Sequence, residues 1–213
     1  MKRALNFMNK TPLVVIPAPI SHWKVDSNTI DSMGLNNGTA TSITYTAGKI
    51  GDCAVFNGTS SIVIGTQSVY AINSGTIACW VKTASAGSSF RAIFLKTLGY
   101  NLFAIDGVIA SYSWTAPSGI KSSGVNINDN NWHHIVRVFE SGGTSDKIYI
   151  DGILRVTFST GIFNAGSTLE LGKSGGSQYF NGKIDMASIW AERLSDAQVL
   201  AVYNLQNSGT DIV

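Results

Sequence analysis

The acidic side chains that could do catalytic chemistry are few and dispersed in this chain. Its three glutamates are Glu140, Glu170 and Glu192. A retaining glycosidase needs two carboxyl groups about 5 Å apart, which on a strand requires two acids on one face. The nearest approach to such spacing is Asp196, four residues after Glu192, at a predicted loop-to-helix junction. Spacing singles out no Ser/His/Asp or Cys/His set either, so we expect a protein without catalytic residues.

Two adjacent histidines, His133 and His134, suggest a metal site but cannot chelate one ion. They fall in an alternating segment, and neighbouring residues of a strand point to opposite faces. His134 shares its face with Trp132 and Val136. The pattern favours a core histidine that is satisfied by a backbone partner over a metal ligand.

Four aromatic residues next to predicted loops are candidate platforms for a sugar, because a pyranose face stacks on a flat ring. They are Tyr100, Tyr112, Trp114 and Tyr179. The alternative for each of them is ordinary packing in the core.

A loop over residues 27–38 is dense in oxygen-bearing side chains, among them Asp31 and Asn36. Such oxygens suit a hard cation, which takes six to eight of them. The alternative is a loop of Asx-turns without an ion.

Composition excludes several classes of protein. Only 13% of the 213 residues are charged, 44% are hydrophobic, and the net charge is +2. No basic stripe is present, which argues against nucleic-acid binding, and no apolar segment has the length of a membrane span. Cys53 and Cys79 lack the CxxC spacing of zinc and redox motifs. They form either one disulfide or two buried thiols, and their apolar neighbours favour reduced thiols.

The elements that must position these residues are strands. Residues 132–139 and 147–150 alternate, and residues 153–158 follow the turn dipeptide Asp151-Gly152, which predicts a three-stranded antiparallel meander. About a dozen such segments at short, even spacing predict an all-β jelly-roll sandwich of two antiparallel sheets. A capping box at Ser195–Gln198 begins one short C-terminal helix. Residues 1–20, with three of the four prolines, predict an extended N-terminal arm before a domain at residues 21–213.

A set of short motifs resembles the laminin-G-like domains of the concanavalin A-like lectin/glucanase superfamily, in the family's order over residues 21–207. The motifs are HWKVD at 22–26, DS…G at 31–38, AGKIG…FNG at 47–58, TIACWV at 76–81, WHHIV at 132–136, IYIDG at 148–152 and FNGKID…IW…LS at 180–195. The resemblance implies a jelly roll that binds glycans or proteins, often with calcium. It points to Asp31 and Asp185 as calcium ligands, with Asn36 beside them. The acid pair of the glucanase relatives is missing.

These features lead to three functional hypotheses. The first is a non-catalytic component of a virus or phage particle, whose arm contacts other subunits and whose lectin-like domain faces outward for adhesion to cell-surface glycans. It rests on the absence of a signal peptide and on the proline-containing arm. The alternative is a stand-alone extracellular carbohydrate-binding lectin. A glycoside hydrolase is the hypothesis that the sequence supports least.

Overall fold

The computed structural model describes residues 14–34, 36–85, 87, 89–163 and 168–213. Fifteen strands, one short 3-10 helix and one α-helix form within these residues. The elements are β1 (Ser21–Trp23), β2 (Thr39–Thr41), β3 (Thr44–Ala47), β4 (Asp52–Asn57), β5 (Ser61–Gly65), η1 (Ser68–Tyr70), β6 (Ser74–Lys82), β7 (Phe90–Lys96), β8 (Asn101–Ile105), β9 (Val108–Ser113), β10 (Gly119–Asn126), β11 (Trp132–Glu140), β12 (Asp146–Ile150), β13 (Ile153–Phe158), β14 (Leu169–Leu171), β15 (Asn181–Trp190) and α1 (Asp196–Asn207).

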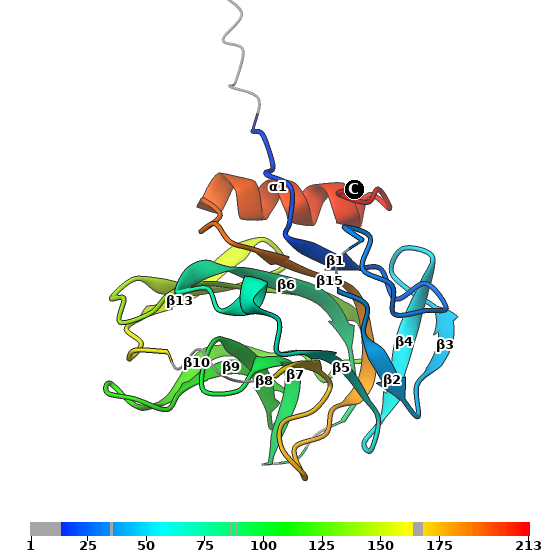
Figure 1. Cartoon of the computed structure of the whole chain (residues 1–213), viewed down its shortest axis with the longest axis horizontal. Helices are drawn as coiled ribbons and strands as arrows, with labels where there is room; N and C mark the ends of the chain where they lie inside the picture. Colours follow the sequence, from blue (N-terminus) through cyan, green and yellow to red (C-terminus); the bar gives the residue numbers. More distant parts are fainter. Residues whose placement is uncertain (1–13, 35, 86, 88, 164–167) are drawn as a thin grey trace, which may run out of the picture.

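The strands form two antiparallel sheets. One has eight strands in the order β13-β12-β11-β6-β15-β4-β3, with β1 also paired to β15, and the other has seven in the order β10-β9-β8-β7-β14-β5-β2. The sheets stack face to face, and α1 lies across the outer face of the eight-stranded sheet (Figure 1). The predicted jelly-roll sandwich with one C-terminal helix is confirmed.

The predicted meander is present as β11, β12 and β13. Asp151 and Gly152 both have positive φ, at 54° and 74°, as a two-residue hairpin turn requires. Alternation along β11 also holds: Ile135 and Phe139 enter the core between the sheets, while Val136 packs under α1. The local pattern therefore predicted both the pairing and the two faces.

Strand β6 lies at the centre of the eight-stranded sheet and is buried on both sides. Ile77, Cys79 and Val81 point into the core between the sheets. Trp80 points the other way, where its ring stacks on Tyr203 of α1 at a centroid distance of 5.7 Å. The helix begins with the predicted capping box, in which Ser195 and Gln198 bond reciprocally. The helix thus closes the outer face of this sheet, and within the described residues no helix covers the outer face of the seven-stranded sheet (Figure 1).

Cys53 and Cys79 are both buried and free, as the reduced alternative predicts. Burial raises the pKa of the Cys53 thiol to about 11, so the thiol is protonated at neutral pH. Neither cysteine is a reactive thiolate.

The described part of the predicted arm, residues 14–20, lies on its own domain. The Trp190 indole donates to the carbonyl of Pro17 at 2.9 Å, and the Gln198 amide donates to the carbonyl of Val15 at 3.0 Å. Ile16 packs against the apolar cluster under α1. Residues 1–13 of the predicted arm lie outside the described residues. Across the part of the chain that is described, no helix has the length and apolarity to cross a membrane.

Candidate functional site

The uncovered outer face of the seven-stranded sheet has an apolar cluster of its own. It contains Ala92 and Leu95 of β7 and Phe103 of β8, with Phe90, Tyr112 and Trp114 packed against them. Ala92, Leu95 and Phe103 are at most 1% exposed, whereas Phe90, Tyr112 and Trp114 are half-buried, so the aromatic part of the cluster reaches the surface. This face is therefore the first candidate for a binding site.

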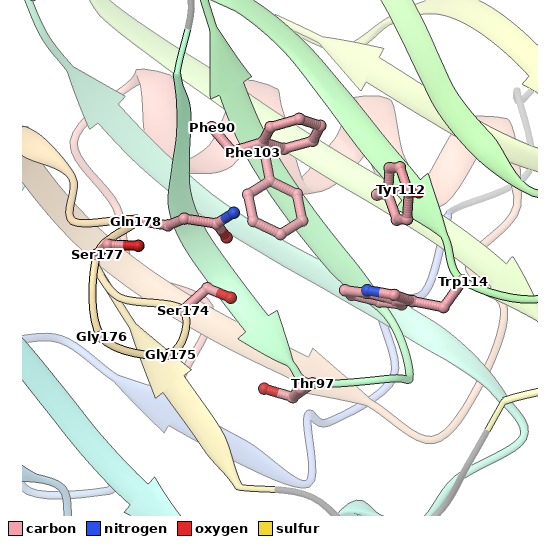
Figure 2. A pocket seen from close by; sticks show the side chains of 10 residues that line it. All are labelled: Phe90, Thr97, Phe103, Tyr112, Trp114, Ser174, Gly175, Gly176, Ser177 and Gln178. Carbon is pink, nitrogen blue, oxygen red and sulfur yellow. The ribbon is translucent and has the colours of Figure 1, made fainter.

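A cavity of about 480 Å³ opens over this cluster, and we call it the aromatic pocket. Its floor and one wall are aromatic, and the facing wall is the loop 174–178, which contributes small and polar residues (Figure 2). The carbonyl of Gln178 accepts from the backbone N–H of Ala92 at 3.1 Å, which fixes the loop to β7. The lining residues are Phe90, Thr97, Phe103, Tyr112, Trp114, Ser174, Gly175, Gly176, Ser177 and Gln178.

The aromatic rings of the pocket meet edge to face in a row. Phe90 meets Phe103 at a centroid distance of 5.4 Å and an interplanar angle of 88°, and Tyr112 at 5.7 Å and 83°. Tyr112 in turn meets Trp114 at 5.5 Å and 68°. Trp114 stands at the end of the row, and Figure 2 shows its indole across the hollow from the loop 174–178. The pocket therefore pairs a half-buried indole with amide and hydroxyl groups, which is the chemistry that holds a saccharide.

A buried asparagine holds Tyr112 in place. The Asn101 side chain accepts from the backbone N–H of Tyr112 at 2.8 Å and donates to the carbonyl of the same residue at 2.9 Å. The β8–β9 ladder ends at the pair Phe103–Ala110. Beyond that pair, the Asn101 side chain bonds to the backbone of Tyr112. It therefore sets the position of Tyr112 in the pocket wall.

The structure sorts the four predicted sugar platforms. Tyr112 and Trp114 both line the aromatic pocket. The prediction of an exposed ring is wrong for Tyr100, which is 0% exposed because it stacks on Phe139 in the core at 4.4 Å. Tyr179 is half-buried and does not line the pocket, although its neighbour Gln178 does. The prediction that these residues bind a glycan stays a prediction.

The sequence reasoning missed Phe90, Phe103 and the loop 174–178. Phe103 alternates with Leu102 and Ala104, so a place on the outer face could have been inferred. No local signal joins the loop 174–178 to β7, because the contact depends on how the strands are ordered in the sheet.

The three predicted calcium ligands have different hydrogen-bond partners. The Asp31 carboxylate accepts three backbone N–H groups: His22 at 2.9 Å and Met33 at 3.0 Å on one oxygen, and Asn36 at 3.3 Å on the other. Those bonds order the loop, as the Asx-turn alternative describes. Asn36 uses its backbone carbonyl to accept from the Trp23 indole at 2.9 Å. Among the described residues no group of three or more His, Cys, Asp or Glu side chains could hold a metal.

Asp185 lies in a different setting, on β15 beneath the turn at residues 48–51. One carboxylate oxygen, Oδ2, accepts from the N–H groups of Lys49 at 2.7 Å and Ile50 at 3.1 Å. The other, Oδ1, is buried without a partner among the described residues. Burial, with a smaller effect from the charge of Asp26, raises the pKa of Asp185 to about 7. An orphaned, buried carboxylate oxygen is a position that a cation fits.

The two adjacent histidines differ as the alternation predicts. His134 is 0% exposed and its ring lies against Trp80 at 5.1 Å, and burial lowers its pKa to about 3. The predicted backbone partner for this ring is wrong, since neither ring nitrogen has a partner within the described parts of the chain. His133 instead points outward between Asp151, at 2.8 Å from Nδ1, and Asp129, at 3.1 Å from Nε2.

We expect the stability that His133 contributes to depend on pH. The hydrogen bond that His133 donates to the Asp151 carboxylate raises the pKa of His133 above its ordinary value of about 6.5. A raised folded-state pKa means that the contribution is complete below pH ~6.5 and is lost as pH rises through the folded pKa. Urea unfolding should therefore show wild type losing a few tenths to about 1 kcal/mol more than His133→Gln between pH 5.5 and 8.5. Parallel losses in the two proteins would contradict this.

A Ser-His-Asp arrangement that spacing did not reveal joins β1, β15 and the C-terminal tail. His22 Nδ1 lies 2.7 Å from Ser188 Oγ, and His22 Nε2 lies 3.0 Å from Asp211. The ring is reversed relative to a catalytic triad, where Nε2 faces the serine. Ser188 is 1% exposed, and its hydroxyl also donates to the carbonyl of Met186 at 3.3 Å. The arrangement therefore ties the tail to the sheet.

The three glutamates lie on separate elements. Glu140 ends β11 and pairs with Arg193, Glu170 is in β14 near Lys173, and Glu192 follows β15. None of the three lines the aromatic pocket.

Comparison with known proteins agrees with this architecture. The model of a family described as the concanavalin A-like lectin/glucanases superfamily matches residues 56–200, more than half of the chain. Among curated proteins, no match was found.

Many solved structures share the fold. Domain 4 of AbnA, a GH43 extracellular arabinanase from Geobacillus stearothermophilus in complex with arabinotriose, is 24% identical with a TM-score of 0.73, covering 87% of this chain and 98% of that one. The binding domain of botulinum neurotoxin DC in complex with SialylT is 16% identical with a TM-score of 0.67, covering 87% and 50%. A mutant Trypanosoma rangeli sialidase is 11% identical with a TM-score of 0.74, covering 92% and 35%. The chain thus spans about half of the toxin domain and about a third of the sialidase.

Proposed function

The chain belongs to the concanavalin A-like lectin/glucanases superfamily, and from this we propose that it is a non-catalytic, carbohydrate-binding domain whose ligand lies in the aromatic pocket. The observation behind the proposal is the pairing of Tyr112 and Trp114 with the polar loop 174–178 around one cavity of about 480 Å³. That volume lies within the roughly 300–1,000 Å³ of small-molecule sites. A ring face binds the apolar face of a sugar, and amides and hydroxyls bind its hydroxyl groups.

The neighbours support this proposal at the level of fold. The AbnA domain is a complex with arabinotriose, and the neurotoxin binding domain is a complex with SialylT. We take from them a first set of probes, namely neutral oligosaccharides such as arabinotriose.

The experiment is a glycan array on the purified chain, followed by calorimetric titration of the best neutral oligosaccharide. We expect saturable binding at one site per chain. A blank array, both with and without calcium, contradicts the proposal.

The absence of catalysis is part of the same proposal and has its own support. The carboxylate pair that hydrolysis of a glycosidic bond needs would have to face the ligand, and no acidic residue lines the aromatic pocket. Release of reducing sugar from an oligosaccharide that binds the pocket would overturn it.

That this domain is a surface component of a virus particle stays a prediction. The alternative stays a stand-alone extracellular lectin. The described part of the arm, at residues 14–20, contacts its own domain through Trp190 and Gln198. Residues 14–20 can therefore be held in place without a neighbouring subunit.

We also propose that a calcium ion binds at Asp185, where the charge of Asp26 also acts, and not at Asp31. A cation there would partner the buried Oδ1 and offset the repulsion between the two acids.

Calcium should accordingly stabilise the wild-type chain against heat, because a ligand that binds only the folded state at 100 times its Kd adds about 2.7 kcal/mol. Asp185→Asn should lose the calcium-dependent shift in Tm, whereas the control Asp129→Asn, on an exposed loop, should keep it. A wild-type Tm that is equal in calcium and in EDTA rejects the site.

A further inference from the structure

A buried ion pair, Arg137 with Asp146, connects the two sheets of the sandwich. Arg137 is on β11 and Asp146 is on β12, both in the eight-stranded sheet. The arginine Nη2 donates to the Asp146 carboxylate at 2.9 Å, and its Nη1 donates to the backbone carbonyl of Asn101 at 3.3 Å. Asn101 begins β8, which belongs to the seven-stranded sheet. The guanidinium therefore bridges the layer between the sheets.

The guanidinium is held in one orientation by aromatic rings as well as by hydrogen bonds. Its carbon lies 5.8 Å, 5.7 Å and 5.6 Å from the ring centroids of Phe139, Phe158 and Phe163. A buried ion pair adds little net stability over apolar side chains, because the cost of desolvating both charges offsets their attraction. What apolar side chains would lack is the ability to direct hydrogen bonds to particular groups. Two routes of such bonds lead from the pair to the aromatic pocket.

The first route, which we call the Asn101 route, joins Arg137 to Tyr112. Arg137 bonds to the backbone carbonyl of Asn101. The side chain of Asn101 then accepts from the N–H of Tyr112 at 2.8 Å and donates to the carbonyl of that residue at 2.9 Å. Asn101 is 0% exposed, and the Ser111 hydroxyl donates to the same amide oxygen at 3.1 Å. Arg137 thus fixes the residue that in turn fixes Tyr112.

The second route, which we call the Thr160 route, leads from Asp146 towards Trp114. The Thr160 hydroxyl donates to the Asp146 carboxylate at 3.1 Å. The next residue, Gly161, donates its backbone N–H to the Ser113 hydroxyl, also at 3.1 Å. Ser113 ends β9 and directly precedes Trp114. The carboxylate therefore holds residues 160–162 against the strand that leads to the indole.

The same segment also contacts the residue that follows Trp114. The Thr115 hydroxyl donates to the carbonyl of Ile162 at 2.9 Å. Gly161 lies so close to this residue that a Cβ on it would be 2.6 Å from the carbonyl carbon and oxygen of Thr115. Both sequence neighbours of Trp114 are thus held by residues 160–162.

We propose that the buried pair Arg137–Asp146 positions Tyr112 and Trp114 for the ligand of the aromatic pocket. Arg137 acts through the Asn101 route, and Asp146 acts through the Thr160 route. Neither member of the pair lines the pocket, so both are positioning residues. The inference rests on the proposed function, because it takes the saccharide to lie against these two aromatic side chains.

The test is the double variant Arg137→Met/Asp146→Leu, in which apolar side chains of similar volume replace the pair. Both routes begin at groups that this variant lacks, whereas its fold is kept by the apolar replacements. Its affinity for the best neutral oligosaccharide should fall about 10-fold by calorimetric titration. The control is Ile148→Val, which shortens a core side chain opposite Arg137 in the strand register and belongs to neither route. It should keep the wild-type affinity.

A matched pair of variants at Thr160 tests the second route by itself. Thr160→Val removes the hydroxyl that bonds to Asp146 and keeps the shape of the side chain, whereas Thr160→Ser keeps the hydroxyl. We expect Thr160→Val to weaken binding of the oligosaccharide and Thr160→Ser to retain it. Equal affinities in the two variants contradict the role of Asp146.

Amide hydrogen exchange provides a readout that needs no ligand. The N–H of Tyr112 bonds to the Asn101 side chain, so its exchange rate reports on the Asn101 route. In the double variant this rate should rise about 10-fold through local opening. The N–H of Ala78, in the central strand β6, should keep its rate. A general loss of stability would instead raise both rates.

Failure of this inference and failure of the proposed function give different results. Wild-type affinity in the double variant, or an equal loss in Ile148→Val, overturns the positioning role while the lectin function stands. If no oligosaccharide binds to wild type, the proposed function is wrong, and the exchange rates alone decide whether the pair fixes the pocket wall. An unchanged rate at Tyr112, or an equal rise at Ala78, then overturns that role as well.

Discussion

Replacing Asp146 with alanine is expected to lower the free energy of unfolding by about 3–5 kcal/mol, because the change leaves a guanidinium in the core without its counter-charge. Arg137 and Asp146 are both 0% exposed, and Nη2 of the arginine donates to the carboxylate at 2.9 Å. The carboxylate also accepts from the backbone N–H of Glu140 at 2.7 Å and from the Thr160 hydroxyl at 3.1 Å. Urea denaturation measures the loss.

The control for this result is the double variant Arg137→Met/Asp146→Leu. Burial is the largest influence on both groups, lowering the pKa of Arg137 and raising that of Asp146. The pair therefore adds little net stability over apolar side chains of similar volume. We expect the double variant to recover most of the stability that Asp146→Ala loses. The explanation fails if the single variant is as stable as wild type, or if the double variant is no more stable than the single.

Replacing Trp114 with alanine is expected to weaken binding of a neutral oligosaccharide about 10- to 100-fold, measured by calorimetric titration. A sugar that covers one face of the indole removes apolar surface from water on both partners, and that burial is worth about 1.4–2.8 kcal/mol. Trp114 packs at the rim of its cluster against Tyr112, so stability should change far less than affinity.

The matched control is Trp132→Ala, which makes the same change at a half-buried tryptophan of the other sheet. We expect this control to keep the affinity for a neutral trisaccharide. Equal losses in the two variants would place the ligand outside the aromatic pocket. Trp114→Phe should restore part of the affinity, because a smaller ring still presents a flat face.

The sequence alone was sufficient wherever one local signal decides the structure. Asp151-Gly152 predicted the turn of the β12–β13 hairpin because few dipeptides adopt positive φ twice. Ser195 and Gln198 predicted the start of α1 because the capping box acts within one helical turn. Alternation in β11 predicted its two faces because the side-chain period of a strand is two.

Alternation does not say which of two faces another layer will cover. Tyr100 follows a loop, as the other predicted platforms adjoin loops, but tertiary packing places it on Phe139 in the core. Asp31 has the side chain of a metal ligand, yet it accepts the backbone N–H groups of Met33 and Asn36 in its own loop and of His22 in β1. Such outcomes depend on which groups converge in space.

The composition and the motifs by themselves determined the all-β class, the family, the meander of β11, β12 and β13, and two of the aromatic residues that line the pocket. Only the tertiary structure decided that Phe90, Phe103 and Tyr112 meet on the outer face of the seven-stranded sheet, that residues 174–178 form the facing wall of their pocket, and that Lys82 lies opposite Lys183. The physical reason is that strand order and register are set by burial of the whole sandwich. Residues about 100 positions apart become neighbours through contacts that no local window contains.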